Sequence, residues 1–188
     1  MDLENIPVFK PLICKDDINA VVESLELGWL GMGSYVKQFE DEVANVCQLQ
    51  PEDNRYVVAV STGHAAMHLA FLAMGIGKGD EVIIPSFNNV ADFQAIKACG
   101  ADPVFVDIDD KTLCIDVNKV KDLITPKTKC IIGMDYDIFT CDHDALKEIS
   151  YRTNIPILHD AAHSFGSYYK GTPIGKQHQF TMFSFDPV

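Results

Sequence analysis

Hydrophobic residues near the start of the chain recur with the spacing of one helix face. In residues 15–28 the apolar positions follow the i, i+3, i+4, i+7 pattern, and Gly28 then provides a stop signal. These positions are Ile18, Val21, Val22 and Leu25. Residues 34–49 repeat the pattern, with Ser34 placed to cap the helix. Two amphipathic helices are therefore predicted to open the chain.

Beyond residue 55 short apolar runs alternate with stretches of helical period. The apolar runs are 56–60, 81–85, 103–108, 129–134, 155–158 and 180–185. The helical stretches are 63–75, 89–100, 116–124 and 142–153. Because parallel neighbouring strands need a crossover connection, this alternation predicts an α/β fold with a mostly parallel central sheet flanked by helices.

Polar groups gather where these predicted strands end. They lie in residues 61–66, 86–92, 159–163 and 184–188. Since ligands of parallel sheets bind beyond the carboxyl ends of the strands, these four segments are predicted to form a binding site.

Composition narrows the classes of partner. The 188 residues are 47% hydrophobic, which suits one substantial core, and the net charge of −12 argues against a nucleic-acid partner. The six cysteines include no C-x-x-C pair, so they favour a reducing compartment. The acidic start is unlike a signal peptide, and no apolar run approaches the roughly 20 residues of a membrane span. A cytoplasmic protein without a membrane partner is predicted.

The stretch IPILHDAAHSFG, residues 155–166, raises a choice between metal binding and acid chemistry. His159 and His163 have the H-x-x-x-H spacing of a zinc pair, but that pair needs a helix to put both rings on one face. Gly166 and the turn-rich residues that follow leave no room for such a helix. We therefore predict no metal site, and Asp160, at the end of a strand, is the candidate for chemistry.

Two other stretches have a plain and a functional interpretation. Ser61, Thr62 and Gly63 form either a simple helix cap or a tight turn whose free N–H groups bind an anion. Trp29, the sole tryptophan, either lines a ligand pocket or packs beside the first two helices.

Several motifs in order resemble the DegT-type nucleotide-sugar aminotransferases, which are pyridoxal-phosphate (PLP) enzymes with the aspartate-aminotransferase fold, fold type I. The resemblance covers essentially the whole chain. The motifs are IPVFKP (6–11), GWLGMGSYVKQFE (28–40), GDEVIIPSF (79–87), GADPVFVDID (100–109), TPKTKCII (125–132), HDAAHSFGSYYKG (159–171) and FSF (183–185). Such proteins are about twice this length, so we expect residues 1–30 to form an N-terminal segment and helix. Residues 31–188 would be an incomplete large PLP-binding domain without the small C-terminal domain.

The resemblance assigns roles to individual residues. Asp160 corresponds to the carboxylate beneath the pyridine nitrogen of PLP, and His163 lies near the phenolic oxygen of the ring; both count as catalytic. Gly63 and His64 match the phosphate-binding turn, and Ser184 matches a serine that reaches the phosphate. The Schiff-base lysine is expected immediately after Val188.

Three positions depart from the family pattern. His64 replaces a hydroxyl residue, and Asn89 stands where an aromatic residue usually covers the ring, a role that Phe87 could take instead. The sequence MDYD, residues 134–137, replaces a common H-x-x-G pattern. The resemblance implies transamination of a nucleotide-linked keto-deoxysugar, with glutamate as the amino donor, by a homodimer with cofactor sites at its interface. The alternatives are a pyridoxamine-phosphate-dependent sugar dehydratase, with histidine in place of the lysine, a non-catalytic binding or regulatory relative, and, weakest, a zinc hydrolase.

Overall fold

A parallel sheet forms the centre of the protein. The structure is a computed structural model, and it describes residues 10–186. Its strand order is β2-β1-β3-β4-β7, and each neighbouring pair is parallel. The strands are β1 (Glu81–Pro85), β2 (Asp102–Val106), β3 (Thr128–Met134), β4 (Ile157–Asp160) and β7 (Phe180–Met182). The hairpin of β5 (Tyr168–Tyr169) and β6 (Thr172–Pro173) is separate. The predicted α/β fold with a parallel sheet is confirmed.

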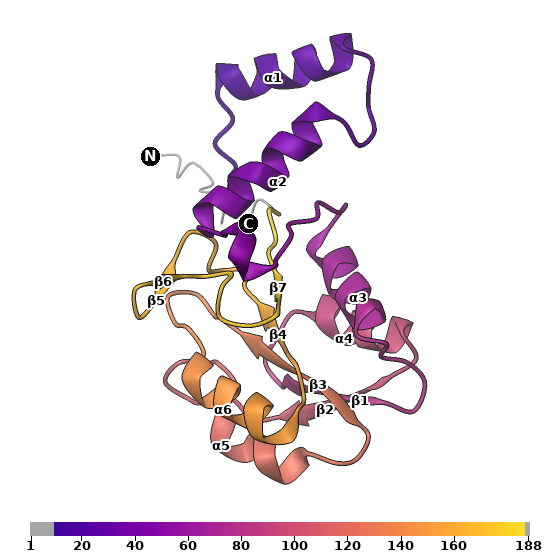
Figure 1. The fold of residues 1–188 in the computed structure, drawn as a ribbon, viewed down its shortest axis with the longest axis vertical. Coiled ribbons are helices and arrows are strands. Elements are labelled where there is room, and N and C mark those ends of the chain that lie inside the picture. The colour runs from indigo at the N-terminus through magenta and orange to yellow at the C-terminus, as the bar shows by residue number, and fades with distance from the viewer. Residues whose placement is uncertain (1–9, 187–188) are drawn as a thin grey trace, which may run out of the picture.

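Helices cover both faces of the sheet (Figure 1). They are α3 (Gly63–Ala73) and α4 (Val90–Ala98) on one face, and α5 (Val117–Val120) and α6 (His143–Thr153) on the other. Neighbouring residues of β4 point to opposite faces, since Leu158 packs with Phe71 of α3 whereas Ile157 packs with Leu146 of α6. The unbroken apolar run in this strand therefore reflects burial on both sides.

The order of the strands reverses between β1 and β3. From β1 the chain crosses through α4 to the edge strand β2, then returns to β3 and continues outward to β4 and β7. A crevice forms at such a reversal, beyond the carboxyl ends of the strands, because the connections leave in opposite directions. This topology places the candidate site.

One predicted strand does not form, and another is shorter than expected. Residues 56–60 join no strand among residues 10–186; the Ala59 N–H donates instead to Glu40 Oε1 at 2.9 Å. The last strand ends at Met182, so Ser184 lies beyond it. The helical stretch predicted at 116–124 is confirmed, as α5 followed by a short 3₁₀ turn, η2 (Lys121–Leu123).

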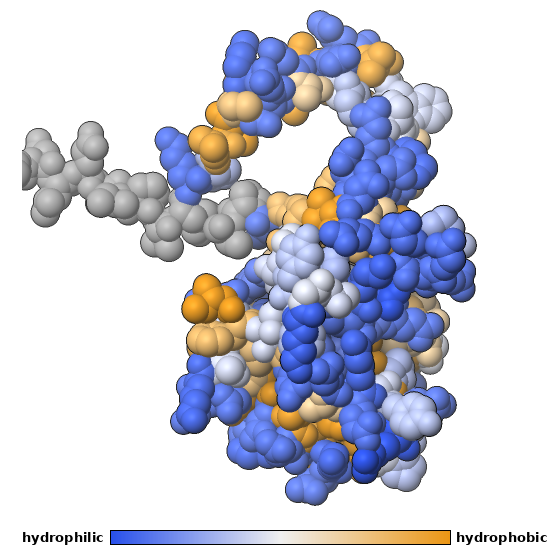
Figure 2. Space-filling view, turned by 60° about the vertical axis from the view of Figure 1, so that its left-hand side comes forward, coloured by the Kyte–Doolittle hydropathy of each residue, from blue (hydrophilic) through white to orange (hydrophobic). Residues whose placement is uncertain are grey.

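The first two helices project from the sheet domain (Figure 1). They are α1 (Lys15–Glu26) and α2 (Ser34–Val46), followed by a 3₁₀ turn, η1 (Pro51–Asp53). Gly33, not Ser34, occupies the N-cap of α2, which corrects the predicted cap. In α1 the predicted apolar face is exposed, with Val21 at 61% and Leu25 at 58%. Figure 2 shows apolar side chains on these projecting helices. The predicted boundary at residue 30, between the N-terminal segment and the large domain, falls in the connection between α1 and α2 and stays a prediction.

Candidate active site

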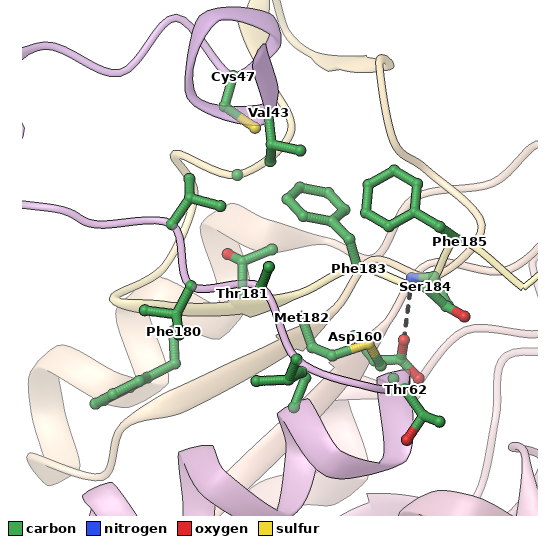
Figure 3. A pocket seen from close by; sticks show the side chains of 18 of the residues that line it. Val43, Cys47, Thr62, Asp160, Phe180, Thr181, Met182, Phe183, Ser184 and Phe185 are labelled. Carbon is green, nitrogen blue, oxygen red and sulfur yellow. Dashed lines mark hydrogen bonds between the residues drawn. The ribbon is translucent and has the colours of Figure 1, made fainter. Parts of the chain in front are cut away.

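A cavity of about 1350 Å³ opens at the carboxyl ends of the strands. All four segments predicted from strand ends contribute to its lining. Thr62, Asp160, Met182 and Ser184 lie together in Figure 3, with Val43 and Cys47 farther up. The volume exceeds the roughly 300–1,000 Å³ of a pocket for one drug-sized ligand, so a cofactor and a substrate can share it.

Asp160 ends β4 and is 2% exposed at the floor of this cavity. Its Oδ1 accepts the N–H of Ala162 at 3.1 Å. Its carboxyl group is also hydrogen-bonded to that of Asp92, a residue of α4 that is equally buried. Asn88 Nδ2 donates to Asp92 Oδ2 at 2.8 Å and holds this second carboxyl in place. The floor therefore carries two adjacent acidic groups.

Burial and mutual repulsion set the protonation of this pair. Burial, together with the neighbouring Asp160 carboxyl, raises the pKa of Asp92 to about 9. Burial also raises the pKa of Asp160, against the hydrogen bonds from Asp92 and Ala162 that lower it. Asp92 is therefore the protonated member at neutral pH and donates its O–H to Asp160. The sequence placed Asp92 in the predicted binding segment 86–92 but indicated no role for it, because one acid in the first turn of a helix carries no signal of its own.

The substitution Asp92→Asn should stabilise the cofactor-free protein as the pH rises. Folding raises the pKa of this carboxyl from near 4 to about 9, so the free energy of unfolding falls as the pH rises between these two values. An amide does not titrate and carries no such loss. The advantage of the variant should therefore grow by about 1 kcal/mol from pH 6 to pH 7. Urea unfolding at both pH values measures this, with the exposed Asp110→Asn as the matched control. A constant difference would contradict the assignment.

The start of α3 faces the same cavity. Thr62 is its N-cap: the hydroxyl accepts the Ala65 N–H at 3.0 Å and the carbonyl accepts the Ala66 N–H at 3.0 Å. Within residues 10–186 no hydrogen bond occupies the N–H groups of Gly63 and His64, so both are available to an anion. Both interpretations of the Ser61–Gly63 turn, cap and anion site, thus fit one structure.

Replacing the cap should cost stability in proportion to the lost bond. We expect Thr62→Ala to lower the free energy of unfolding by about 1 kcal/mol, because the Ala65 N–H loses its acceptor. Thr62→Ser keeps the hydroxyl and should stay within about 0.5 kcal/mol of the wild type. Urea unfolding of the three proteins measures the difference, and equal stability of the alanine and serine variants would show that the hydroxyl does not cap the helix.

The remaining expected site residues divide into two groups. His64, Asn89, His163 and Ser184 line the cavity with Gly63 and Asp160. Asn89 also caps α4 by accepting the Ala91 N–H at 2.9 Å. His163 is exposed, and its Nδ1 accepts the N–H of Asp137 at 3.2 Å. The expected site residues that follow strand ends are thus brought together.

The aromatic residues considered for the site lie elsewhere. Phe87 packs on Tyr136 with ring centroids 5.0 Å apart and is not part of the cavity lining. Trp29 is 71% exposed between α1 and α2, where its Nε1 donates to the Met32 carbonyl at 3.1 Å. The structure therefore does not bring Trp29 to the cavity, and a substrate-binding role for it stays a prediction. The lysine expected after Val188 lies outside the described residues.

The histidine pair with zinc-like spacing is separated. His159 lies fully buried on the α6 face of β4, whereas His163 is exposed at the cavity. No long helix follows the strand: residues 161–167 form a turn that leads into the β5–β6 hairpin. His159 instead contacts Asp135, a grouping that the sequence did not predict.

Comparison with known proteins gives a consistent result. The sequence profile of the DegT/DnrJ/EryC1/StrS aminotransferase family matches residues 11–188. The UDP-4-amino-4-deoxy-L-arabinose–oxoglutarate aminotransferase of Shewanella sediminis is 40% identical over 176 residues, which are 94% of this chain and 44% of that protein. The chain therefore spans less than half the length of this relative.

Solved structures share the fold. Spr1654 of Streptococcus pneumoniae in its PLP-form superposes with a TM-score of 0.89 at 34% identity, over 98% of this chain and 50% of the other. 3-Amino-5-hydroxybenzoic acid synthase gives a TM-score of 0.88 at 35% identity, over 96% of this chain and 46% of the other. In residues 10–186 no helix has the length and apolarity needed to cross a membrane.

Proposed function

Because the chain belongs to the DegT/DnrJ/EryC1/StrS aminotransferase family, we propose that it is the cofactor-binding part of a PLP-dependent aminotransferase. Its substrate would be a nucleotide-linked keto-deoxysugar, and its amino donor glutamate. The name of the Shewanella relative, which pairs a UDP-linked amino sugar with oxoglutarate, supports both choices. The observation that carries the proposal is the buried Asp160 carboxyl facing the same cavity as the start of α3.

The residues present fit PLP. No lysine or arginine among residues 10–186 pairs with Asp160, so this buried carboxyl suits a cationic ring nitrogen. At the other end, a Cβ on Gly63 would lie 3.3 Å from Met182 Sδ and 3.3 Å from Ser184 Cβ. The absence of a side chain there lets the start of α3 lie against the end of β7 and leaves its N–H groups open to a phosphate.

Each group then has a defined task. PLP, when bound, supplies an electron-accepting ring that stabilises the charge left when an amino acid loses its α-proton. Asp160 would hold the ring nitrogen in its protonated form, oriented by the bond from Asp92. Ser184 and the N–H groups of Gly63 and His64 would bind the phosphate. His163 accepts a hydrogen bond at Nδ1, so its proton resides on Nε2, which can donate to the phenolic oxygen.

The cofactor and its attachment can be tested on the full-length protein. We expect a visible absorption band that borohydride removes, with the reduced cofactor attached to a lysine directly after Val188 in the peptide map. A UDP-linked 4-keto sugar and glutamate should then yield the amino sugar and oxoglutarate in a ping-pong reaction. A colourless protein that does not bind added PLP would overturn the proposal. A histidine after Val188 would favour the sugar dehydratase. PLP binding without turnover would favour a regulatory relative.

We also propose a homodimer with cytoplasmic location. The exposed apolar face of α1 supports the association, because an unpaired face of this kind gains free energy when it is covered. The double substitution Val21→Glu and Leu25→Glu should dissociate the dimer in sedimentation experiments. The matched pair Glu23→Gln and Glu26→Gln on the same helix should leave it intact.

A further inference from the structure

Three buried side chains meet behind the cavity, on the α6 face of the sheet. Asp135 follows β3, His159 lies in β4, and His143 begins α6. All three are 0% exposed, and one ligand atom from each lies within 4.8 Å of the others. Asp135 Oδ1 is 3.2 Å from His143 Nε2, and Asp135 Oδ2 is 2.8 Å from His159 Nε2. Two imidazoles and a carboxylate form a donor set suited to a zinc-type divalent ion.

The charge of Asp135 needs a compensating cation. Its other contacts are neutral donors: the Cys141 N–H at 2.9 Å and the Ser164 hydroxyl at 2.7 Å. Within the part of the chain that the structure describes, no lysine or arginine forms an ion pair with it. A fully buried carboxylate is costly unless a positive group accompanies it. That group is either a proton shared with the histidines or a metal ion.

The geometry of His143 favours the metal ion. Its Nδ1 lies 3.0 Å from His178 Nε2, which fixes the orientation of the ring. Its Nε2 lies 3.2 Å from Asp135 Oδ1 in poor alignment for a hydrogen bond, and it has no other partner among the described residues. Tetrahedral zinc with bonds near 2.0–2.1 Å holds neighbouring ligand atoms about 3.3 Å apart. The 3.2 Å between His143 Nε2 and Asp135 Oδ1 matches this spacing. The 2.8 Å between His159 Nε2 and Asp135 Oδ2 is a hydrogen bond that the ion would replace.

We propose that Asp135, His143 and His159 bind one structural zinc-type ion. The Ser164 hydroxyl beside them would supply the fourth ligand atom, an oxygen. His178 would orient His143 from the outer shell, as partners of metal-bound histidines do. Because the three ligands come from the end of β3, from α6 and from β4, the ion would join the strand that carries Asp160 to its neighbours. Its complete burial is typical of a structural site and not of a catalytic one.

Metal content and cobalt spectra of the full-length protein test this site. We expect about one zinc per chain by elemental analysis after purification without chelators. After the zinc is removed, added Co²⁺ should give the intense d–d bands of a tetrahedral site, at longer wavelength than the PLP absorption. His143→Asn should lose both the zinc and the bands. His68→Asn, which removes a histidine outside the cluster, should retain both.

Three results would overturn the proposal. In the first, the wild-type protein contains no zinc and shows no cobalt bands. In the second, neither zinc nor a chelator shifts its melting temperature. In the third, His143→Asn retains its full metal content. The first two would mean that a proton holds the cluster, and the third that any ion lies elsewhere. If His143→Asn does not fold, the cobalt spectrum of the wild type alone decides. PLP binding is read separately at its own absorption band, so failure here leaves the proposed function untouched.

Discussion

Asp160→Asn should lower the turnover of the full-length protein in the proposed transamination by about 10³-fold. At about 4 Å and an effective dielectric constant of about 20, a carboxylate and a protonated ring nitrogen attract by about 4 kcal/mol. An amide loses this attraction, and each 1.36 kcal/mol corresponds to tenfold in rate. The amide keeps the size of the side chain and an oxygen that can accept the Ala162 N–H, which in the wild type lies 3.1 Å from Asp160 Oδ1. The fold should therefore persist. Turnover with glutamate and PLP affinity measure the loss.

The matched control is Asp110→Asn, the same chemical change at an exposed position. It should retain the activity of the wild type, and both variants should melt cooperatively. An Asp160→Asn protein with near-full turnover would remove Asp160 from the mechanism, even if it still bound PLP.

The position of the site could be predicted because it depends on topology. Alternating strands and helices require parallel pairing, and parallel pairing gathers the strand ends at one edge of the sheet. Asp160, which ends β4, and Ser184, which follows β7, lie in segments predicted for this reason, whereas their roles come from the family resemblance. Local spacing alone gave the wrong element at residues 56–60, because a strand also needs a partner, and none of the described residues provides one.

Contacts between distant residues could not be predicted. Asp92 and Asp160 are separated by two strands in the sequence, and their carboxyl groups meet only because α4 and β4 face the same crevice. In the sequence Asp135 stands out only as part of MDYD, a departure from the family pattern. Its histidine neighbours come from a helix and a strand, so no spacing along the chain relates them. Fold and strand ends follow from periodicity, whereas side-chain clusters follow from packing.

Asp135→Ala should lower the free energy of unfolding by about 3–5 kcal/mol, the range for removing one partner from a buried ionic group. The Cys141 N–H and the Ser164 hydroxyl would lose their acceptor in a region closed to water, and each unsatisfied group costs about 1–3 kcal/mol. Urea unfolding of the full-length protein measures the loss. Ser164→Ala removes a single donor and should cost less, about 1 kcal/mol.

The exposed Asp122→Ala provides the matched control for this loss, because it removes the same group without breaking a buried contact. Its stability should stay within about 0.5 kcal/mol of the wild type. If Asp135→Ala were as stable as Asp122→Ala, the cluster would not hold β3 and β4 together. The orientation of Asp160 would then have to depend on the Asp92 and Ala162 hydrogen bonds alone.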